Sequence, residues 1–185
     1  MIPYAQLTEM DDAALMLRAR DDDREAFAVL VKRHQKMLLN FFARSGVQYD
    51  YEDLVQQTFL RLYRYRDRYV VTAKFTTFLF LLARQVWIDE LRRRKRHERL
   101  AEGLAAEPHP DHVAPVAADA GAAGGMDLGP ALASLPESLR QVVELGVYQD
   151  LPYAEIADIL KIPVGTVKSR MFNALAKLRA YLEEK

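Results

Sequence analysis

The composition of one central segment limits what the rest of the chain can fold into. Residues 101–133 contain 20 Ala, Gly and Pro residues, five acidic residues, no Lys or Arg, and no Phe, Trp or Tyr. Such a segment cannot bury enough apolar surface to offset the entropy lost on ordering it. We therefore predict a flexible linker at 101–133 that joins two compact units, residues 1–100 and 134–185. A flexible chain of this length spans roughly 30–35 Å, so the two units can bind separated points on one partner.

Both units have the hydrophobic periodicity of α-helices. Apolar residues recur at steps of three and four within 23–44, 51–66 and 75–96, and a short helix at 11–20 would complete a bundle. No window alternates strictly enough to predict a strand. We therefore expect an all-α fold with two small helical domains, an N-terminal helical bundle and a C-terminal helix-turn-helix domain, joined by the flexible linker.

Acidic residues mark the expected helix starts. Asp50 is predicted to cap the second long helix, with Asp53 in its acidic first turn, and the acidic groups at 11–12 and 21–23 adjoin two further starts. His34 falls on the apolar stripe of the first long helix. We expect it to be a hydrogen-bonded core histidine rather than a metal ligand.

The second unit has the spacing of a helix-turn-helix. A helix at 136–148 is followed by a short helix at 153–160, a break at 161–163 and a longer helix at 165–182. The charges divide along this unit, because residues 134–160 hold one cation and five anions whereas 161–185 hold six cations and two anions. Positive potential is therefore concentrated on the last helix.

A projection of the last helix at about 100° per residue separates an apolar side from a polar side. The apolar side, which we expect to be buried, consists of Val167, Met171, Ala174, Leu175 and Leu178. The opposite side consists of Thr166, Ser169, Phe172, Asn173 and Ala176, with Lys168 and Arg179 on one edge and Arg170 and Lys177 on the other. Small and amide side chains between two rows of cations suit a helix that reads a major groove. The alternative is a basic amphipathic helix that only packs.

A second basic surface follows aromatic residues in the first unit. Phe80 and Trp87 lie away from the main apolar belt of the helix at 75–96, with Arg84 between them, and five cations follow at 92–96. Cations beside aromatic rings suit melted nucleic acid, whose bases stack while its phosphates are neutralised. For the two aromatic residues themselves we favour core packing over base stacking. The run at 92–96 is expected to bind phosphates.

Several function classes are excluded. The chain has no cysteine, so it has no disulfide framework, thiolate metal site or cysteine nucleophile. No apolar run reaches about 18 residues and the N-terminus has no signal-peptide pattern, so we expect a cytoplasmic protein without membrane insertion. His109 and His112 lie in the expected linker, which supplies no preorganised metal geometry. With no phosphate loop or nucleophile constellation, we expect no enzyme, no cofactor and no metal.

Three segments together resemble one protein family. The sequences YEDLVQQTFLRLYRYRD at 51–67, FTTFLFLLARQVWIDELRRRKR at 75–96, and the C-terminal stretch at 135–179 look like the two conserved domains of a bacterial RNA polymerase sigma factor of the extracytoplasmic-function group. The resemblance implies that residues 1–100 form a region 2-like domain that binds core RNA polymerase and melts the minus-ten element of promoter DNA. It implies that residues 134–185 form a region 4-like domain that reads the minus-thirty-five element.

The resemblance also assigns roles to individual residues. The implied polymerase-binding residues are Asp53, Leu54, Gln56, Gln57, Phe59 and Arg61. The implied minus-ten contacts, including the base-capturing loop at 69–74, are Tyr69, Thr72, Lys74, Arg84, Gln85, Arg92 and Arg93. Together with the projection, it assigns the minus-thirty-five contacts to Thr166, Lys168, Ser169, Arg170, Phe172, Asn173 and Lys177. The chain differs from the family's usual residue at Gln57, where Glu is usual, at Phe78, where Trp is common, and at Gln85, where Asn is common.

We therefore predict a sigma factor that directs promoter-specific initiation, and an anti-sigma factor as a further partner that clamps both domains across the linker. One alternative is a sigma-like adaptor that sequesters a regulator by mimicry and never binds DNA. The cationic edges of the last helix and the run at 92–96 favour the DNA binder, because a mimic could lose both. A free-standing helix-turn-helix repressor is a second alternative, but it leaves the segment at 51–67 unexplained.

Overall fold

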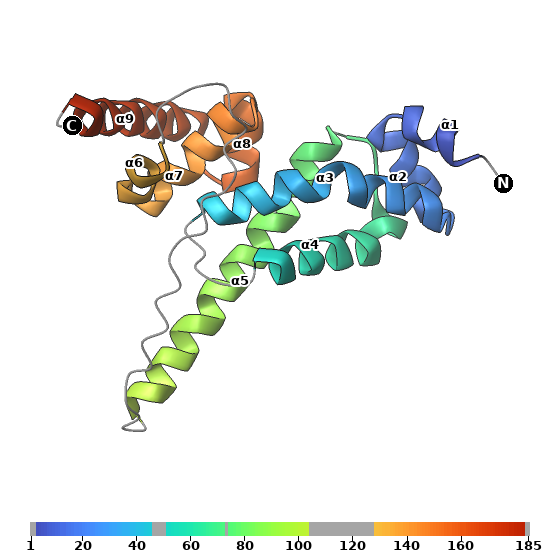
Figure 1. Ribbon diagram of the computed structural model, residues 1–185, viewed down its shortest axis with the longest axis horizontal. Coiled ribbons are helices and arrows are strands. Elements are labelled where there is room, and N and C mark those ends of the chain that lie inside the picture. The colour runs from blue at the N-terminus through green and yellow to red at the C-terminus, as the bar shows by residue number, and fades with distance from the viewer. Residues whose placement is uncertain (1–2, 46–50, 73, 104–127, 184–185) are drawn as a thin grey trace.

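The computed structural model describes residues 3–45, 51–72, 74–103 and 128–183 (Figure 1). Over these ranges the regular secondary structure is entirely helical, which confirms the predicted all-α class. The predicted cap Asp50, together with His109 and His112, lies outside the described residues.

The N-terminal unit is a bundle whose long helices lie at the predicted positions. Its elements are α1 (Tyr4–Glu9), α2 (Asp12–Arg20), α3 (Arg24–Arg44), α4 (Tyr51–Tyr65), the 3-10 turn η1 (Arg66–Arg68) and α5 (Phe75–Gly103). Asp11 and Asp23 cap α2 and α3, accepting hydrogen bonds from the backbone N–H of Ala14 at 2.7 Å and Ala26 at 3.1 Å. The six-residue α1 was not predicted, because one buried residue, Leu7, gives no periodicity to detect.

The bundle core forms where α3 packs against α2 and α4, and α4 against α5. Phe80 is fully buried and Trp87 is 3% exposed, which confirms core packing over base stacking. His34 is also buried, and its Nε2 lies 2.8 Å from Asp12 Oδ2, as expected for a hydrogen-bonded core histidine. Burial opposes ionisation of Asp12, but its hydrogen bonds and ion pairs with His34 and Arg33 lower the pKa of that carboxyl below its ordinary value.

Helical structure enters the segment predicted as linker from both sides. Helix α5 continues past the predicted end at Arg96 to Gly103, and α6 occupies Gly129–Ser134. The first extension follows because no helix breaker interrupts 75–102, so each added residue gains a backbone hydrogen bond. The second follows because Leu132 is buried where α6 packs on α3 and α9. Residues 104–127 lie outside the described residues.

The C-terminal unit contains the expected helix-turn-helix. Its elements are α6, α7 (Glu137–Val143), the π-helical turn η2 (Glu144–Tyr148), α8 (Tyr153–Leu160) and α9 (Val164–Glu183). Helices α7 and α8 both pack against α9. Gly146 of η2 lies so close to α9 that a Cβ there would be 2.6 Å from Met171 Cε. The two units also touch, because α8 packs on α5 and α6 packs on α3.

Candidate promoter-binding and polymerase-binding surfaces

The turn between α8 and α9 sets the position of the last helix. Lys161 ends α8 with a left-handed backbone, φ 55° and ψ 46°, and the next N–H, of Ile162, donates to Ala157 O at 3.1 Å. The first turn of α9 is then closed by Thr166 N–H and Val167 N–H, which donate to Pro163 O at 2.9 Å and 3.1 Å. This pattern ends one helix sharply and starts the next within three residues.

The left-handed conformation of Lys161 gives a stability prediction. A non-glycine residue with this backbone costs roughly 1–2 kcal/mol, which glycine avoids, although glycine loses more chain entropy on folding. Lys161→Gly is therefore expected to stabilise the protein by about 0.5–1 kcal/mol. Urea denaturation followed by circular dichroism measures the effect. Lys177→Gly in the interior of α9 is the matched control, expected to destabilise by about 1 kcal/mol; equal effects at both positions would contradict the explanation.

Helix α9 has the two sides that the projection predicted, with one exception. Val167, Met171 and Ala174 are buried against the unit. Leu178 is partly buried, but Leu175 is 51% exposed, so its predicted burial is wrong. At about 100° per residue Leu175 lies about 80° from Val167, at the edge of the apolar stripe.

The outer side of α9 is a polar strip between cations. Lys168, Ser169, Asn173 and Lys177 are exposed, Phe172 is 75% exposed, and Thr166 and Arg170 are partly exposed. Within the part of the chain that the structure describes, the bordering cations Lys168, Arg170, Lys177 and Arg179 form no ion pair. We call this set of eight residues the α9 strip. Its positive charge is available for phosphates.

The loop before α5 exposes different residues from those predicted. Tyr69 is 5% exposed, with its ring 5.6 Å from that of Phe78 and 6.4 Å from that of Phe75, and burial raises the pKa of its hydroxyl. Tyr69 therefore supports the loop from inside, and its ring is not exposed to a partner in this structure. Thr72 and Lys74 are exposed as expected. Val70 and Val71, which sequence reasoning missed, are 67% and 52% exposed.

Acidic neighbours neutralise part of the basic run on α5. Arg92 Nη1 lies 3.8 Å from Asp89 Oδ1. Arg93 Nε lies 2.8 Å from Glu90 Oε2, and Arg94 Nε lies 2.7 Å from Glu90 Oε1. Hydrogen bonds from the two arginines outweigh burial and lower the pKa of Glu90. The spacing of Asp89 and Glu90, three and four residues before the arginines, is the sequence signal that predicts these pairs.

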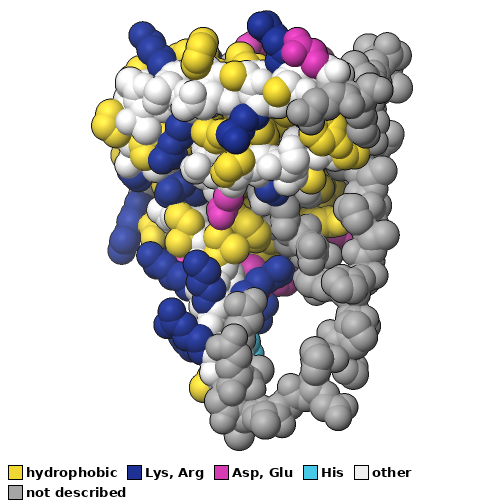
Figure 2. Space-filling model, turned by 90° about the vertical axis from the view of Figure 1, so that its left-hand side faces the viewer, with side chains coloured by type: hydrophobic (Ala, Val, Ile, Leu, Met, Phe, Trp, Pro, Cys, Tyr) yellow, Lys and Arg dark blue, Asp and Glu magenta, His cyan; other side chains and the backbone are white. Residues whose placement is uncertain are grey.

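The exposed cations of α5 without ion pairs lie further along the helix. Among the described residues they are Lys95, Arg96 and Arg99. Figure 2 shows Lys and Arg side chains gathered over the distal part of α5, which extends beyond the rest of the bundle in Figure 1. Nearer its start, Gln85 is exposed, while Arg84 is partly buried and its Nε has no hydrogen-bond partner among the residues that the structure describes.

The implied polymerase-binding residues divide between core and surface. Leu54 and Phe59 are 3% and 7% exposed, so they hold α4 in the bundle. Asp53 and Gln56 are exposed, and Asp53 Oδ2 accepts a hydrogen bond from Gln57 Nε2 at 2.6 Å. Arg61 Nη2 lies 2.7 Å from Asp89 Oδ2, and this ion pair connects α4 to α5.

A groove beside these residues extends the α4 surface. It has a volume of about 490 Å³ and is lined by Arg24, Phe27, Val31, Gln56, Phe59, Leu60 and Tyr63 of α3 and α4. Leu60 is 56% exposed. The sequence signal for it is that Leu60 is a large apolar residue outside the buried stripe of α4.

No described helix has the length and apolar character needed to cross a membrane. The described residues also contain no group of three or more acidic, His or Cys side chains suited to a metal ion.

Comparison with known proteins shows which family the chain resembles along both units. Residues 30–97 match Sigma-70 region 2, and residues 131–180 match Sigma-70, region 4. The chain is 37% identical over 177 residues to the ECF RNA polymerase sigma factor SigF of Caulobacter vibrioides, covering 92% of this chain and 93% of that one. It is similar in structure to CnrH in complex with the cytosolic domain of CnrY, with a TM-score of 0.66, 26% identity, and coverage of 94% and 98%. The sigma factor RpoE of Bartonella quintana, solved with the anti-sigma factor NepR, matches with a TM-score of 0.65, 27% identity, and coverage of 80% and 91%.

These features define a transcription initiation factor with both promoter-recognition regions. The chain belongs to the extracytoplasmic-function group of RNA polymerase sigma factors. It is therefore a DNA-binding subunit that directs core RNA polymerase to promoters, and it is not an enzyme.

Proposed function

We propose that the α9 strip reads the minus-thirty-five element in the major groove, while α5 and the loop before it melt the minus-ten element. The observation that carries this proposal is the arrangement of α9, whose polar side chains are exposed above a buried ridge and bordered by four cations without ion pairs in the described structure. Ser169 and Asn173 supply hydrogen bonds to base edges, and Phe172 supplies apolar contact with a thymine methyl group. The bordering cations contact both phosphate backbones.

In this proposal the minus-ten surface consists of the exposed loop and one side of α5. Thr72 and Lys74 contact the displaced strand, and the exposed Val70 and Val71 offer apolar surface to an unstacked base. Gln85 extends this surface along α5. The phosphates further along are neutralised by the cations of the distal helix, Arg92, Arg93, Lys95, Arg96 and Arg99.

Core polymerase binds the exposed side of α4 in the same proposal. Asp53, Gln56 and Gln57 form its polar part and Leu60 its apolar part. Polar groups around an apolar contact are typical of the arrangement in which one buried residue carries much of the binding free energy. Because the chain acts only with core polymerase and promoter DNA, we place it in the cytoplasm.

An anti-sigma factor is a further partner under this proposal. Two similar structures are complexes, one of CnrH with the cytosolic domain of CnrY and one of RpoE with the anti-sigma factor NepR. Their likeness to this chain extends over most of its length, which supports an anti-sigma factor as a partner of this chain.

Run-off transcription with purified core polymerase tests the proposal. The protein is expected to start transcription at specific promoters, and Lys168→Glu should reduce the product about 10- to 100-fold, because it replaces a phosphate contact with repulsion. The variant should still bind core. Lys36→Glu, the same charge change at an exposed position of α3, is the matched control. A chain that binds core yet starts no transcript on any promoter would instead support the adaptor reading.

A further inference from the structure

Glu90 is a buried carboxylate on the helix that carries the basic run. It is 7% exposed, and both of its oxygens accept hydrogen bonds from arginines. Arg93 donates from Nε to Oε2 at 2.8 Å and from Nη2 to Oε1 at 3.1 Å, and Arg94 donates from Nε to Oε1 at 2.7 Å. Both arginines reach the same carboxylate because residues three and four positions apart lie on one side of a helix. The two-point bond fixes the plane of the Arg93 guanidinium as well as its position.

The other cations of the run are held less tightly. Arg92 Nη1 lies 3.8 Å from Asp89 Oδ1, which is too far for a hydrogen bond, and the Arg92 side chain is 75% exposed. In the described part of α5, the further cations Lys95, Arg96 and Arg99 form no ion pair. The run therefore contains two kinds of cation, which differ in how firmly they are oriented rather than in charge.

Arg93 can hold a second partner while it stays on Glu90. A guanidinium has five N–H donors, and the two-point bond to Glu90 uses two of them. The Arg93 side chain is still 65% exposed, so donors remain for a group outside the protein. The hydrogen bonds to Glu90 and the charge of Asp53 on α4 together raise the pKa of Arg93, so the guanidinium stays charged. An exposed, charged and oriented arginine suits a phosphate at a fixed place.

We propose that Glu90 is a positioning residue for promoter melting, which holds Arg93 ready for one phosphate of the minus-ten element and also weakens binding of the free chain to DNA of any other sequence. The proposal rests on the proposed function, because it needs Arg93 to belong to the minus-ten surface. A carboxylate beside the arginines cancels part of the attraction that phosphates exert regardless of sequence. A guanidinium that is oriented before binding loses less conformational entropy when its phosphate arrives. Glu90 therefore favours the promoter over other DNA.

Glu90→Gln removes the charge and keeps the size of the side chain. Fluorescence anisotropy with the free full-length chain and a random duplex of about 30 base pairs measures the first effect. The released arginine neutralises one more phosphate, so the affinity at about 0.1 M salt should rise about 5- to 10-fold, and the dependence of log K on log salt should steepen by about 1. Glu25→Gln is the matched control, because it removes the same charge at an exposed position of α3, and it should change the affinity by less than about twofold.

Run-off transcription with core polymerase measures the second effect. Glu90→Gln should lower the product about 3- to 10-fold relative to Glu25→Gln, because the loosened arginine must now be ordered when it binds. The two assays therefore move in opposite directions. A purely structural role for Glu90 would not give this result, since partial unfolding would lower both.

Arg93→Lys separates orientation from charge. Lysine keeps the positive charge but cannot make the two-point bond with Glu90. We expect its affinity for the random duplex to stay within about twofold of that of the unmodified chain, and its run-off product to fall about 3- to 10-fold. If Glu90→Gln loses its helical circular dichroism, Arg93→Lys decides the matter alone.

The positioning role is overturned if Glu90→Gln, while folded, does not move the two assays in opposite directions, or if Arg93→Lys leaves the run-off product unchanged. Arg93→Gln distinguishes this failure from failure of the proposed function. If Arg93→Gln leaves the run-off product unchanged, Arg93 contacts no promoter phosphate, and the minus-ten surface itself is assigned wrongly. If Arg93→Gln lowers the product and Glu90→Gln does not, only the role of Glu90 is wrong.

Discussion

Replacing Leu60 by aspartate is expected to abolish binding to core RNA polymerase while the protein stays folded. Leu60 is 56% exposed on α4, beside the groove formed with Phe27 and Val31 of α3, so an apolar contact with the polymerase is available there. Loss of an apolar anchor at the centre of an interface costs about 2 kcal/mol or more. Burying an unpaired carboxylate adds to this cost. We therefore expect the affinity for core to fall by at least about 100-fold, measured by fluorescence anisotropy of the labelled sigma factor.

Val70→Asp is the matched control for the polymerase experiment. Val70 is an apolar residue with 67% exposure, and it lies on the proposed minus-ten loop. Its replacement should leave the affinity for core unchanged, and both variants should keep the helical circular dichroism of the unmodified chain. If Leu60→Asp binds core as well as Val70→Asp does, the polymerase does not use this groove.

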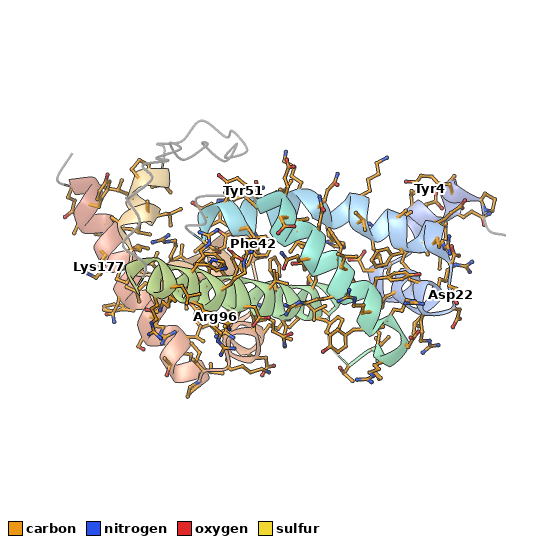
Figure 3. All side chains as sticks on the ribbon, turned by 90° about the horizontal axis from the view of Figure 1, so that it is seen from below. Tyr4, Asp22, Phe42, Tyr51, Arg96 and Lys177 are labelled. Carbon is orange, nitrogen blue, oxygen red and sulfur yellow. The ribbon has the colours of Figure 1, made fainter. Side chains whose placement is uncertain are left out.

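Phe42→Ala is expected to cause a large loss of stability. Phe42 is fully buried on α3, within the N-terminal bundle, and its ring centroid lies 5.3 Å from that of Phe41 (Figure 3). A phenylalanine-to-alanine change at such a site costs about 3–5 kcal/mol. This is a large part of the roughly 5–15 kcal/mol that stabilises a typical folded protein. Urea denaturation followed by circular dichroism measures the change in the free energy of unfolding.

Phe172→Ala makes the same substitution on the α9 strip and serves as the control. Because Phe172 is 75% exposed, its removal should change the free energy of unfolding by no more than about 0.5 kcal/mol. It should instead weaken promoter binding. Similar losses of stability at Phe42 and Phe172 would contradict the burial that the structure gives them.

The positions of the main helices followed from periodicity, because each helix buries one stripe of side chains. The predicted helices at 11–20 and 153–160 match α2 and α8 closely. Composition alone predicted neither the extension of α5 nor the presence of α6. For α6 the reason is that alanine and glycine content does not tell whether a neighbouring helix is present to bury Leu132. The exposure of Leu175 was not predicted either, because a residue at the edge of an apolar stripe is buried or exposed according to how the neighbouring helices pack.

Part of the candidate site was also predictable from hydrophobic periodicity. The side of α9 that carries Ser169 and Asn173 follows from the positions of its apolar residues, which any partner helix must cover. The burial of Tyr69 was not predicted because a loop has no periodicity, and only the positions of Phe75 and Phe78 show that its ring is buried. The pairing of Arg93 and Arg94 with Glu90 was readable from spacing, since it is local to one helix.

The sequence by itself determined the helical class, the positions of the main helices, and the identity of both promoter-recognition regions. These properties depend on residues close together in the chain, whose spacing fixes which side of a helix is apolar. Only the tertiary structure decided that Glu144 meets Arg44, 100 positions away, and that Glu155 meets Lys74. Contacts between distant segments depend on how whole helices pack, and no local pattern of residues encodes that arrangement.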